Sequence, residues 1–133
     1  IELKEKMDRV EDAVCATKAA IKEGIVPGGG IALLNASSNI KAKSDGETIL
    51  LEAIRAPFKT ILENAGIIDI DIPKIKGRGL DVITGKTVNM IDYGIIDPLL
   101  VTKSALKNAA SVATTILSTD CVINNIRIDE SNR

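Results

Sequence analysis

The sequence predicts a mainly α-helical fold, and three features carry that prediction. Aromatic residues make up only 2% of the 133 residues, so the core has to be built from aliphatic side chains, as in closely packed helices. Apolar residues recur every three or four positions over long stretches, which is the helical period. Prolines stand where helices are expected to begin. We expect a bundle of about five helices with a small β-hairpin and a terminal strand.

The first helix is predicted to run from the N-terminus to Gly24. Its apolar positions advance by alternate steps of four and three, through Leu3, Met7, Val10, Val14, Thr17 and Ile21. This spacing gives a helix one apolar face that can be buried. Glycine is a common residue at the end of a helix, so Gly24 is the expected stop.

A run of three glycines, Gly28–Gly30, lies inside the stretch EGIVPGGGIALL at residues 23–34. Free backbone N–H groups at a helix start can bind an anion, so the run is a candidate phosphate cradle. The same run would equally allow a sharp turn between two packed helices, and the stretch alone leaves both interpretations open. A helix over residues 31–43 should follow, with a turn at 44–46.

The pattern of residues 47–66 is helical in period, but Pro57 interrupts it. Proline removes a helical hydrogen bond and disfavours helix in the residue before it. One helix should therefore end near Arg55, and another should begin with Pro57 in its first turn. Gly66 is a natural C-terminal cap. Residues 67–78 show no clear period and are predicted to form a loop.

The last third of the chain combines short strands with one long helix. The stretch LDVITGKTVNMI at 80–91 predicts a hairpin that turns at TGK. Asp97 is the expected N-cap of the long helix and Pro98 its first residue. The helix carries a stripe of mostly small residues at Val101, Ala105, Ala109, Val112 and Ile116. Residues 120–128 resemble a terminal strand.

Charge and composition exclude several functional classes. The 17 basic and 18 acidic residues give a net charge of −1, and no basic stripe indicates a nucleic acid partner. The apolar runs are shorter than the roughly 20 residues that span a bilayer, and the N-terminus is too charged for a signal peptide. The chain lacks an initial Met and enters directly into a helical pattern, so we expect it to be cut from something longer.

The sequence contains no histidine, which excludes a Ser-His-Asp triad, a Cys-His pair and histidine-bound zinc. The available chemistry therefore rests on carboxylates, backbone amides and metal-bound phosphate. Cys15 and Cys121 stand far apart in apolar surroundings. We expect both to be buried, reduced thiols rather than partners in a disulfide.

Three stretches together resemble one family: RVEDAVCATKAAIKEGIVPGGGIALL (9–34), TGKTVNMIDYGIIDPLLVTKSALKNAASVA (84–113) and TILSTDCVI (115–123). They are similar in order and rough spacing to the C-terminal part of the group I chaperonins, the GroEL-type proteins. The resemblance covers nearly the whole chain. It implies an ATP-driven folding machine made of rings, with equatorial, intermediate and apical domains in each subunit.

The resemblance implies that residues 1–24 are the end of the intermediate domain. Residues 25–133 would form the C-terminal half of the equatorial, ATP-binding domain. The implied function is that of a fragment of an ATP-dependent chaperone that assists protein folding and refolding, with ATP or ADP and Mg²⁺ as cofactors. The main phosphate loop and a magnesium-binding carboxylate would lie outside this sequence, so the chain is not expected to hydrolyse ATP alone.

The resemblance also implies partners: unfolded proteins and a co-chaperonin for the full-length parent, and other subunits of a homo-oligomeric ring. Neither nucleic acid nor a membrane is an expected partner. An apolar surface left uncovered should make the isolated chain self-associate. The implied location is the bacterial cytoplasm or the matrix of mitochondria or plastids.

Two positions in the first matching stretch correspond to functional residues of the family. Asp12 matches the aspartate that helps to activate the water attacking the γ-phosphate, a role that needs an oriented nucleophile more than a strong base. The residues alone favour the simpler interpretation, in which Asp12 is a solvated acid on a helix face. Gly29 matches a position whose backbone lies against the nucleotide, where any side chain would obstruct it.

The remaining site residues come from the second matching region. Asp81, Val82 and Ile83 match the segment beside adenine and ribose, although the family usually has small residues where this chain has Val82 and Ile83. Ile95 would line the adenine pocket, or would be an ordinary core residue. Asp97 matches the carboxylate that accepts hydrogen bonds from the ribose hydroxyls, a role compatible with N-capping because a carboxylate has several lone pairs.

Two other functions stay open on the residues. The chain could be a free-standing helical interaction module without nucleotide chemistry, which the larger side chains of Val82 and Ile83 would favour. It could also be a small phosphate-binding enzyme that uses Asp12 and Asp97 as a carboxylate pair. Nucleotide binding separates the chaperonin piece from the module, and turnover without a partner separates the enzyme from both.

Overall fold

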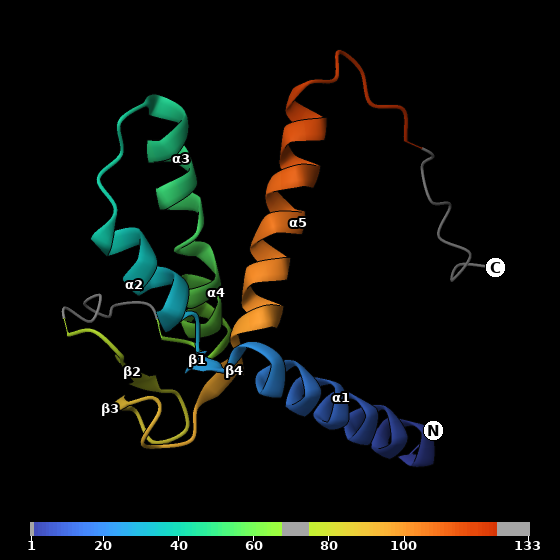
Figure 1. Cartoon of the computed structure of the whole chain (residues 1–133), viewed down its shortest axis with the longest axis vertical. Coiled ribbons are helices and arrows are strands. Elements are labelled where there is room, and N and C mark those ends of the chain that lie inside the picture. Colours follow the sequence, from blue (N-terminus) through green and yellow to red (C-terminus); the bar gives the residue numbers. More distant parts are fainter. Residues whose placement is uncertain (1, 68–74, 125–133) are drawn as a thin grey trace.

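The computed structural model describes residues 2–67 and 75–124 (Figure 1). Within them the fold is mainly helical, with two short antiparallel strand pairs. This confirms the predicted fold class. Most of the loop predicted for residues 67–78 lies outside the described residues, and so does the second half of the predicted terminal strand. Its described half, residues 120–124, forms no strand.

Helix α1 (Glu2–Glu23) ends where the sequence predicts, at Gly24 with φ of +84°. Ala19 is its buried residue. The apolar stripe is exposed among the described residues, with Met7 and Val10 each 64% accessible. Figure 1 shows why: only the C-terminal end of α1 meets the rest of the chain, and its N-terminal part projects away. The stripe therefore defines a face that residues 2–67 and 75–124 leave uncovered.

A strand pair that the sequence did not predict joins the two matching regions. Strand β1 (Ile25–Pro27) pairs antiparallel with β4 (Ile96–Pro98), with Val26 opposite Asp97. The prediction of Asp97 as N-cap and Pro98 as first helical residue is wrong. Pro98 is extended, with ψ of 128°, and no side chain caps the helix that follows. The carbonyl of Gly24 accepts the first helical N–H, that of Leu99, at 3.1 Å.

Helix α2 (Ile31–Asn39) is shorter than the predicted 31–43, because Ile40 is extended. The predicted turn at 44–46 is instead a helix start. The hydroxyl of Ser44 accepts the N–H of Glu47, and the Glu47 carboxylate accepts the N–H of Lys43 at 2.6 Å. This arrangement resembles a capping box, whose Ser-x-x-Glu spacing is present in the sequence.

Helices α3 (Asp45–Ala53) and α4 (Ala56–Asn64) are separated at the predicted break, with Pro57 in the first turn of α4. Gly66 follows α4 with φ of +73° and donates its N–H to the carbonyl of Glu63. Both predictions are confirmed. The predicted hairpin is confirmed as well: β2 (Arg78–Asp81) pairs antiparallel with β3 (Lys86–Asn89).

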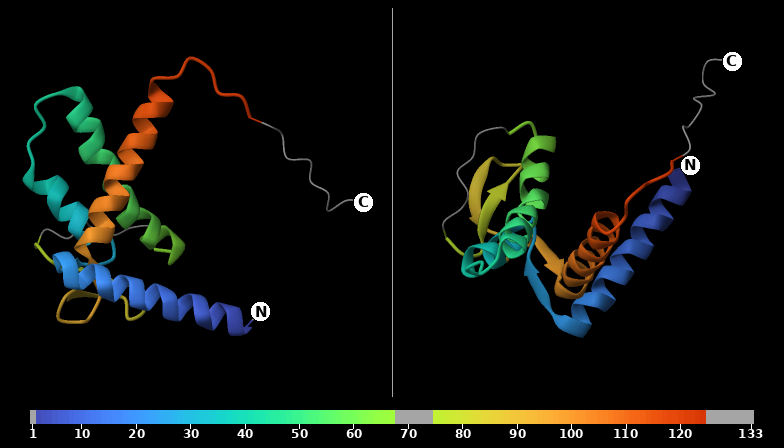
Figure 2. Two further views of the ribbon diagram at one scale, coloured as in Figure 1. Left: turned by 45° about the vertical axis from the view of Figure 1, so that its right-hand side comes forward. Right: turned by 90° about the horizontal axis from the view of Figure 1, so that it is seen from above.

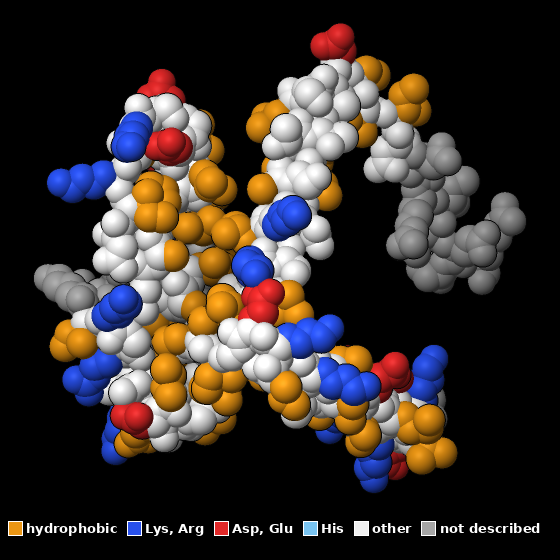
Figure 3. Space-filling model, viewed as in Figure 1, with side chains coloured by type: hydrophobic (Ala, Val, Ile, Leu, Met, Phe, Trp, Pro, Cys, Tyr) orange, Lys and Arg blue, Asp and Glu red, His pale blue; other side chains and the backbone are white. Residues whose placement is uncertain are grey.

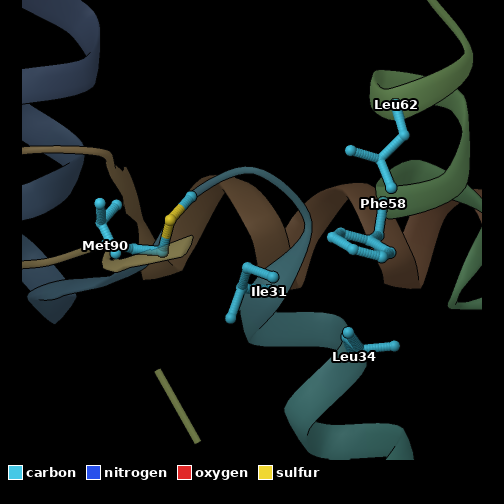
Figure 4. Close-up of a cluster of buried hydrophobic side chains, with 6 residues drawn as sticks. Ile31, Leu34, Phe58, Leu62 and Met90 are labelled. Atoms are coloured by element: carbon cyan, nitrogen blue, oxygen red, sulfur yellow. The ribbon is translucent and has the colours of Figure 1, made fainter. Parts of the chain in front are cut away.

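The core lies between α2, α4 and the hairpin (Figure 4). It consists of the buried side chains of Ile31, Leu34, Phe58, Leu62, Val88 and Met90. Ser37 is buried beside it, where its hydroxyl donates to the carbonyl of Leu34 and accepts from Arg55. The buried hydroxyl thereby has both of its partners. Its bond from Arg55 joins α2 to the junction of α3 and α4.

Helix α5 (Leu99–Leu117) has no buried residue within the described structure. Its N-terminal half packs against the end of α1, where Lys103 and Glu23 form an ion pair of 2.6 Å. Figure 1 and Figure 2 show that the two helices meet at these ends and run in different directions from there. Three residues of the stripe on α5, Val101, Ala105 and Ala109, line a groove described below. Both cysteines are free but exposed, so their predicted burial is wrong: α1 and the segment after α5 lie outside the core.

Substitution of glycine in the triplet should destabilise the fold. A Cβ on Gly30 would lie 2.7 Å from the backbone N of Phe58, at a φ of +75°. Strain and overpacking each cost about 1–3 kcal/mol, so Gly30→Ala should lower the urea midpoint strongly. Gly94→Ala, with φ of +74° and open space, should show the strain alone. Gly46→Ala in α3, with neither problem, should be neutral or stabilising. Equal effects for all three would contradict this account.

Candidate functional site

A groove runs between the α3–α4 segment and α5, with a volume of about 720 Å³. Figure 3 shows hydrophobic side chains gathered between these elements. The groove is lined by small and aliphatic residues, including Leu50, Ile54, Ile61, Val101, Ala105, Ala109 and Ala113. Gly29, Gly30 and Asp97 line it as well. Two of the predicted site residues, Gly29 and Asp97, thus share one cavity.

Asp97 is the polar centre of this groove. Of the described residues that line it, Asp97 alone carries a charge, and no described group donates a hydrogen bond to its carboxylate. The side chain stays open to solvent, yet the apolar walls remove part of its hydration. This partial burial raises the pKa of Asp97 above its usual value, since desolvation disfavours the charged form. The groove therefore presents one acceptor without a donor.

The glycine triplet connects β1 to α2, whereas the sequence suggested a turn between two helices. Gly29 and Gly30 have φ of +65° and +75°. Each glycine also lies against another protein group: a Cβ on Gly28 would lie 3.1 Å from the carbonyl of Ile95, and one on Gly29 would lie 2.9 Å from the Met90 methyl. The positive φ of Gly29 and Gly30, together with these close approaches, therefore favours glycine here whatever the groove binds.

Ile95 lies beside the groove without lining it. Its side chain is partly buried and packs against the core cluster, as the simpler interpretation of the sequence expects. Its backbone has a second role, because its carbonyl accepts the N–H of Gly28 at 2.9 Å. Ile95 thus holds the glycine triplet next to the strand that carries Asp97.

Asp81, Val82 and Ile83 stand where the β2–β3 hairpin turns, and none of them lines the groove. The Asp81 carboxylate accepts the Thr84 hydroxyl at 2.6 Å and the N–H of Ile83 at 3.0 Å. Both hydrogen bonds lower the pKa of Asp81, and the one from Thr84 has the larger effect. Ile83 is 92% exposed. Asp81 therefore closes the turn, and the structure does not bring the hairpin tip to Asp97.

Asp12 is exposed in the middle of α1. It precedes Glu23, where α1 meets α5, by about 16 Å at the rise of an α-helix. It does not line the groove, and Figure 1 shows that this part of α1 points away from it. The structure therefore does not support a carboxylate pair of Asp12 and Asp97.

Sequence reasoning missed Thr102, which lines the groove one turn after Pro98. Its hydroxyl donates to the Pro98 carbonyl at 3.4 Å.

No metal site was predicted from these residues. The described ranges contain no group of three His, Cys, Asp or Glu side chains that could hold an ion. None of the described helices has the length and hydropathy to cross a bilayer.

Asp97 should make stability depend on pH. Its raised pKa means that the folded chain loses stability as pH rises through that value, because a partly desolvated carboxyl must then ionise. Below the ordinary pKa of Asp, about 3.9, the group is protonated in both states and has no effect. Asp97→Asn should therefore raise the urea midpoint at neutral pH and leave it unchanged below about pH 3. A variant that is less stable at neutral pH would contradict the desolvation.

Comparison with known proteins identifies a family model and solved structures that this chain matches. The model of the TCP-1/cpn60 chaperonin family matches residues 1–127. A solved structure, described as the crystal structure of a group III chaperonin in the open state, superimposes with a TM-score of 0.67 at 30% sequence identity. The match covers 79% of this chain and 25% of that one. The chain therefore spans about a quarter of the length of the solved chaperonin.

Proposed function

This chain belongs to the TCP-1/cpn60 chaperonin family, and we propose that its groove binds the nucleoside end of ATP or ADP. The observation that carries the proposal is that Gly29 and Asp97 line the same groove. They lie far apart in the sequence, and the resemblance assigned both to the nucleotide. The assignment to group I rather than another chaperonin group stays a prediction.

The chemistry of the groove suits a nucleoside better than a phosphate chain. Aliphatic walls can contact a base, and the unpartnered carboxylate of Asp97 can accept hydrogen bonds from ribose hydroxyls. The volume of about 720 Å³ lies within the usual range of ligand pockets, about 300–1,000 Å³. No cationic side chain lines the groove among the described residues, so phosphates and Mg²⁺ would need groups from elsewhere.

The other predicted site residues take supporting places in this proposal. Asp12 would be the carboxylate that orients water, but it lies on an exposed face of α1. Asp81, Val82 and Ile83 would flank the base only if the hairpin turn reached it. We therefore expect the chain to bind nucleotide weakly and not to hydrolyse ATP alone.

The function of the whole protein is proposed by family membership. It would be ATP-dependent protein folding by a ring of subunits, with unfolded proteins and a co-chaperonin as partners. Residues 1–24 would end the intermediate domain and residues 25–133 would belong to the equatorial domain, with the boundary at the point where α1 stops. The bacterial cytoplasm or an organelle matrix would be the location.

Titration calorimetry with Mg²⁺-ADP tests the proposed site. Asp97→Ala should weaken binding about tenfold to a hundredfold, because a hydrogen bond to a charged group contributes about 1.5–3 kcal/mol. Asp92→Ala is the matched control, since Asp92 is an exposed carboxylate that does not line the groove, and it should bind as the parent does. Equal binding by both variants would place the nucleotide elsewhere. Absence of binding in the parent would overturn the proposal for this chain.

The exposed apolar faces favour a second candidate, a helical interaction module. On α5, Val112 and Ile116 are 60% and 58% exposed, and they continue the apolar side of the groove. Exposed patches of this kind mark surfaces that bind other proteins. This candidate needs no nucleotide and predicts that the same faces associate.

Self-association should therefore depend on α5. Light scattering at high concentration should show oligomers of the parent, and Val112→Lys should shift them toward monomer by placing a charge in the apolar face. Thr114→Lys adds the same charge on the opposite side of the exposed helix and should leave the association unchanged. A monomeric parent would contradict the prediction.

A further inference from the structure

We propose that Met90 is a positioning residue for the nucleotide site, a role that rests on the proposed function above. Met90 is 2% exposed and lies directly after β3. It does not line the groove. Its side chain and its backbone, however, contact Gly29 and Ile95, which the resemblance assigned to the nucleotide site, and Gly77 and Gly79 at the start of the hairpin.

The side chain of Met90 lies under two glycines from different parts of the chain. A Cβ on Gly29 would lie 2.9 Å from the Met90 Cε, and a Cβ on Gly79 would lie 2.9 Å from its Sδ. Figure 4 shows the sulfur and terminal methyl of Met90 pointing to the loop that leads into α2. Met90 thus lies between Gly29 and Gly79, and at Gly79 it shares the space with Ile31, whose Cγ1 would be 2.6 Å from that Cβ.

The backbone of Met90 connects the same segments by hydrogen bonds. Its N–H donates to the carbonyl of Gly77, before β2, at 3.1 Å, and its carbonyl accepts the N–H of Ile95 at 2.8 Å. The carbonyl of Ile95 in turn accepts the N–H of Gly28 at 2.9 Å. A continuous path therefore runs from the hairpin through Met90 to Ile95, two residues before Asp97, and back to the triplet.

The consequence is geometric. The backbone of Gly29 lines the groove on one side and packs against the Met90 side chain on the other. Met90 therefore holds Gly29 at the groove wall. An unbranched thioether fills an irregular gap of this kind well. Loss of the side chain would leave a cavity behind Gly29, and the triplet could then move away from the groove.

The test compares Met90→Ala with Leu62→Ala in the 133-residue chain. Leu62 belongs to the same core but stands on the far side of Ile31 from Met90 (Figure 4). Both truncations remove a buried aliphatic side chain, so both should lower the denaturant midpoint. Denaturant midpoints establish that each variant folds. Met90→Leu, which conserves the volume, serves as the rescue.

Two readouts separate positioning from general loosening. Amide hydrogen exchange at Gly28 and Ile95 should rise at least tenfold more in Met90→Ala than in Leu62→Ala, and Met90→Leu should restore it. The Mg²⁺-ADP dissociation constant should rise at least fivefold in Met90→Ala and less than twofold in Leu62→Ala. Equal changes in both variants, in either readout, would overturn the positioning role.

The readouts also keep the two proposals apart. If the parent chain binds no Mg²⁺-ADP, the proposed function fails, while the exchange rates still decide whether Met90 holds the triplet. If the parent binds and Met90→Ala binds equally well, the proposed function stands and the positioning role is overturned. If Met90→Ala does not fold, Met90→Val, which removes less of the side chain, provides the same comparison with Leu62→Val.

Discussion

The pairing of β1 with β4 holds the two halves of this chain together, and the candidate site depends on it. Each strand has three residues, and a pair this short is marginal by itself. Bonds on both sides extend it: Gly28 donates to Ile95, and Leu99 donates to Gly24. The ion pair between Glu23 and Lys103 adds a side-chain contact at the same end. The start of α5 is thereby fixed beside the end of α1.

The pairing of β1 with β4 explains why Asp97, from the second matching region, lies near the glycine triplet. Asp97 is opposite Val26, and Val26 stands two residues before Gly28, the first glycine of the triplet. The groove lies beyond this strand pair, between α5 on one side and α4 on the other. An N-capping role would have aimed the carboxylate at helical N–H groups. In the strand it keeps its lone pairs free for a ligand.

The core and the groove use different parts of the helices. Buried side chains gather between α2, α4 and the hairpin, while α1 and α5 meet the rest mainly at the pair of β1 and β4. Their apolar faces stay exposed within the described residues. The same observation supports both candidate functions, because a subunit of a ring and an interaction module each need apolar surface that a partner covers.

The sequence by itself determined the features that depend on neighbouring residues. The end of α1 at Gly24, the break at Pro57, the cap at Gly66 and the hairpin follow from local backbone preferences, so they could be predicted. The resemblance also predicted Gly29 and Asp97 as site residues. Both line the groove, and their role toward a nucleotide stays a prediction.

Only the tertiary structure decided how distant segments meet. A three-residue strand carries no period, so the pairing of Val26 with Asp97 could not be predicted, and the N-cap expected from Asp-Pro lost to it. The exposure of Cys15 likewise depends on what packs against α1, which its helical period does not state. The place of Asp81 at a turn that does not line the groove, and of Met90 against Gly29 and Gly79, follows from long-range packing. Such contacts have no signature in a single sequence, because they depend on which surfaces the fold brings together.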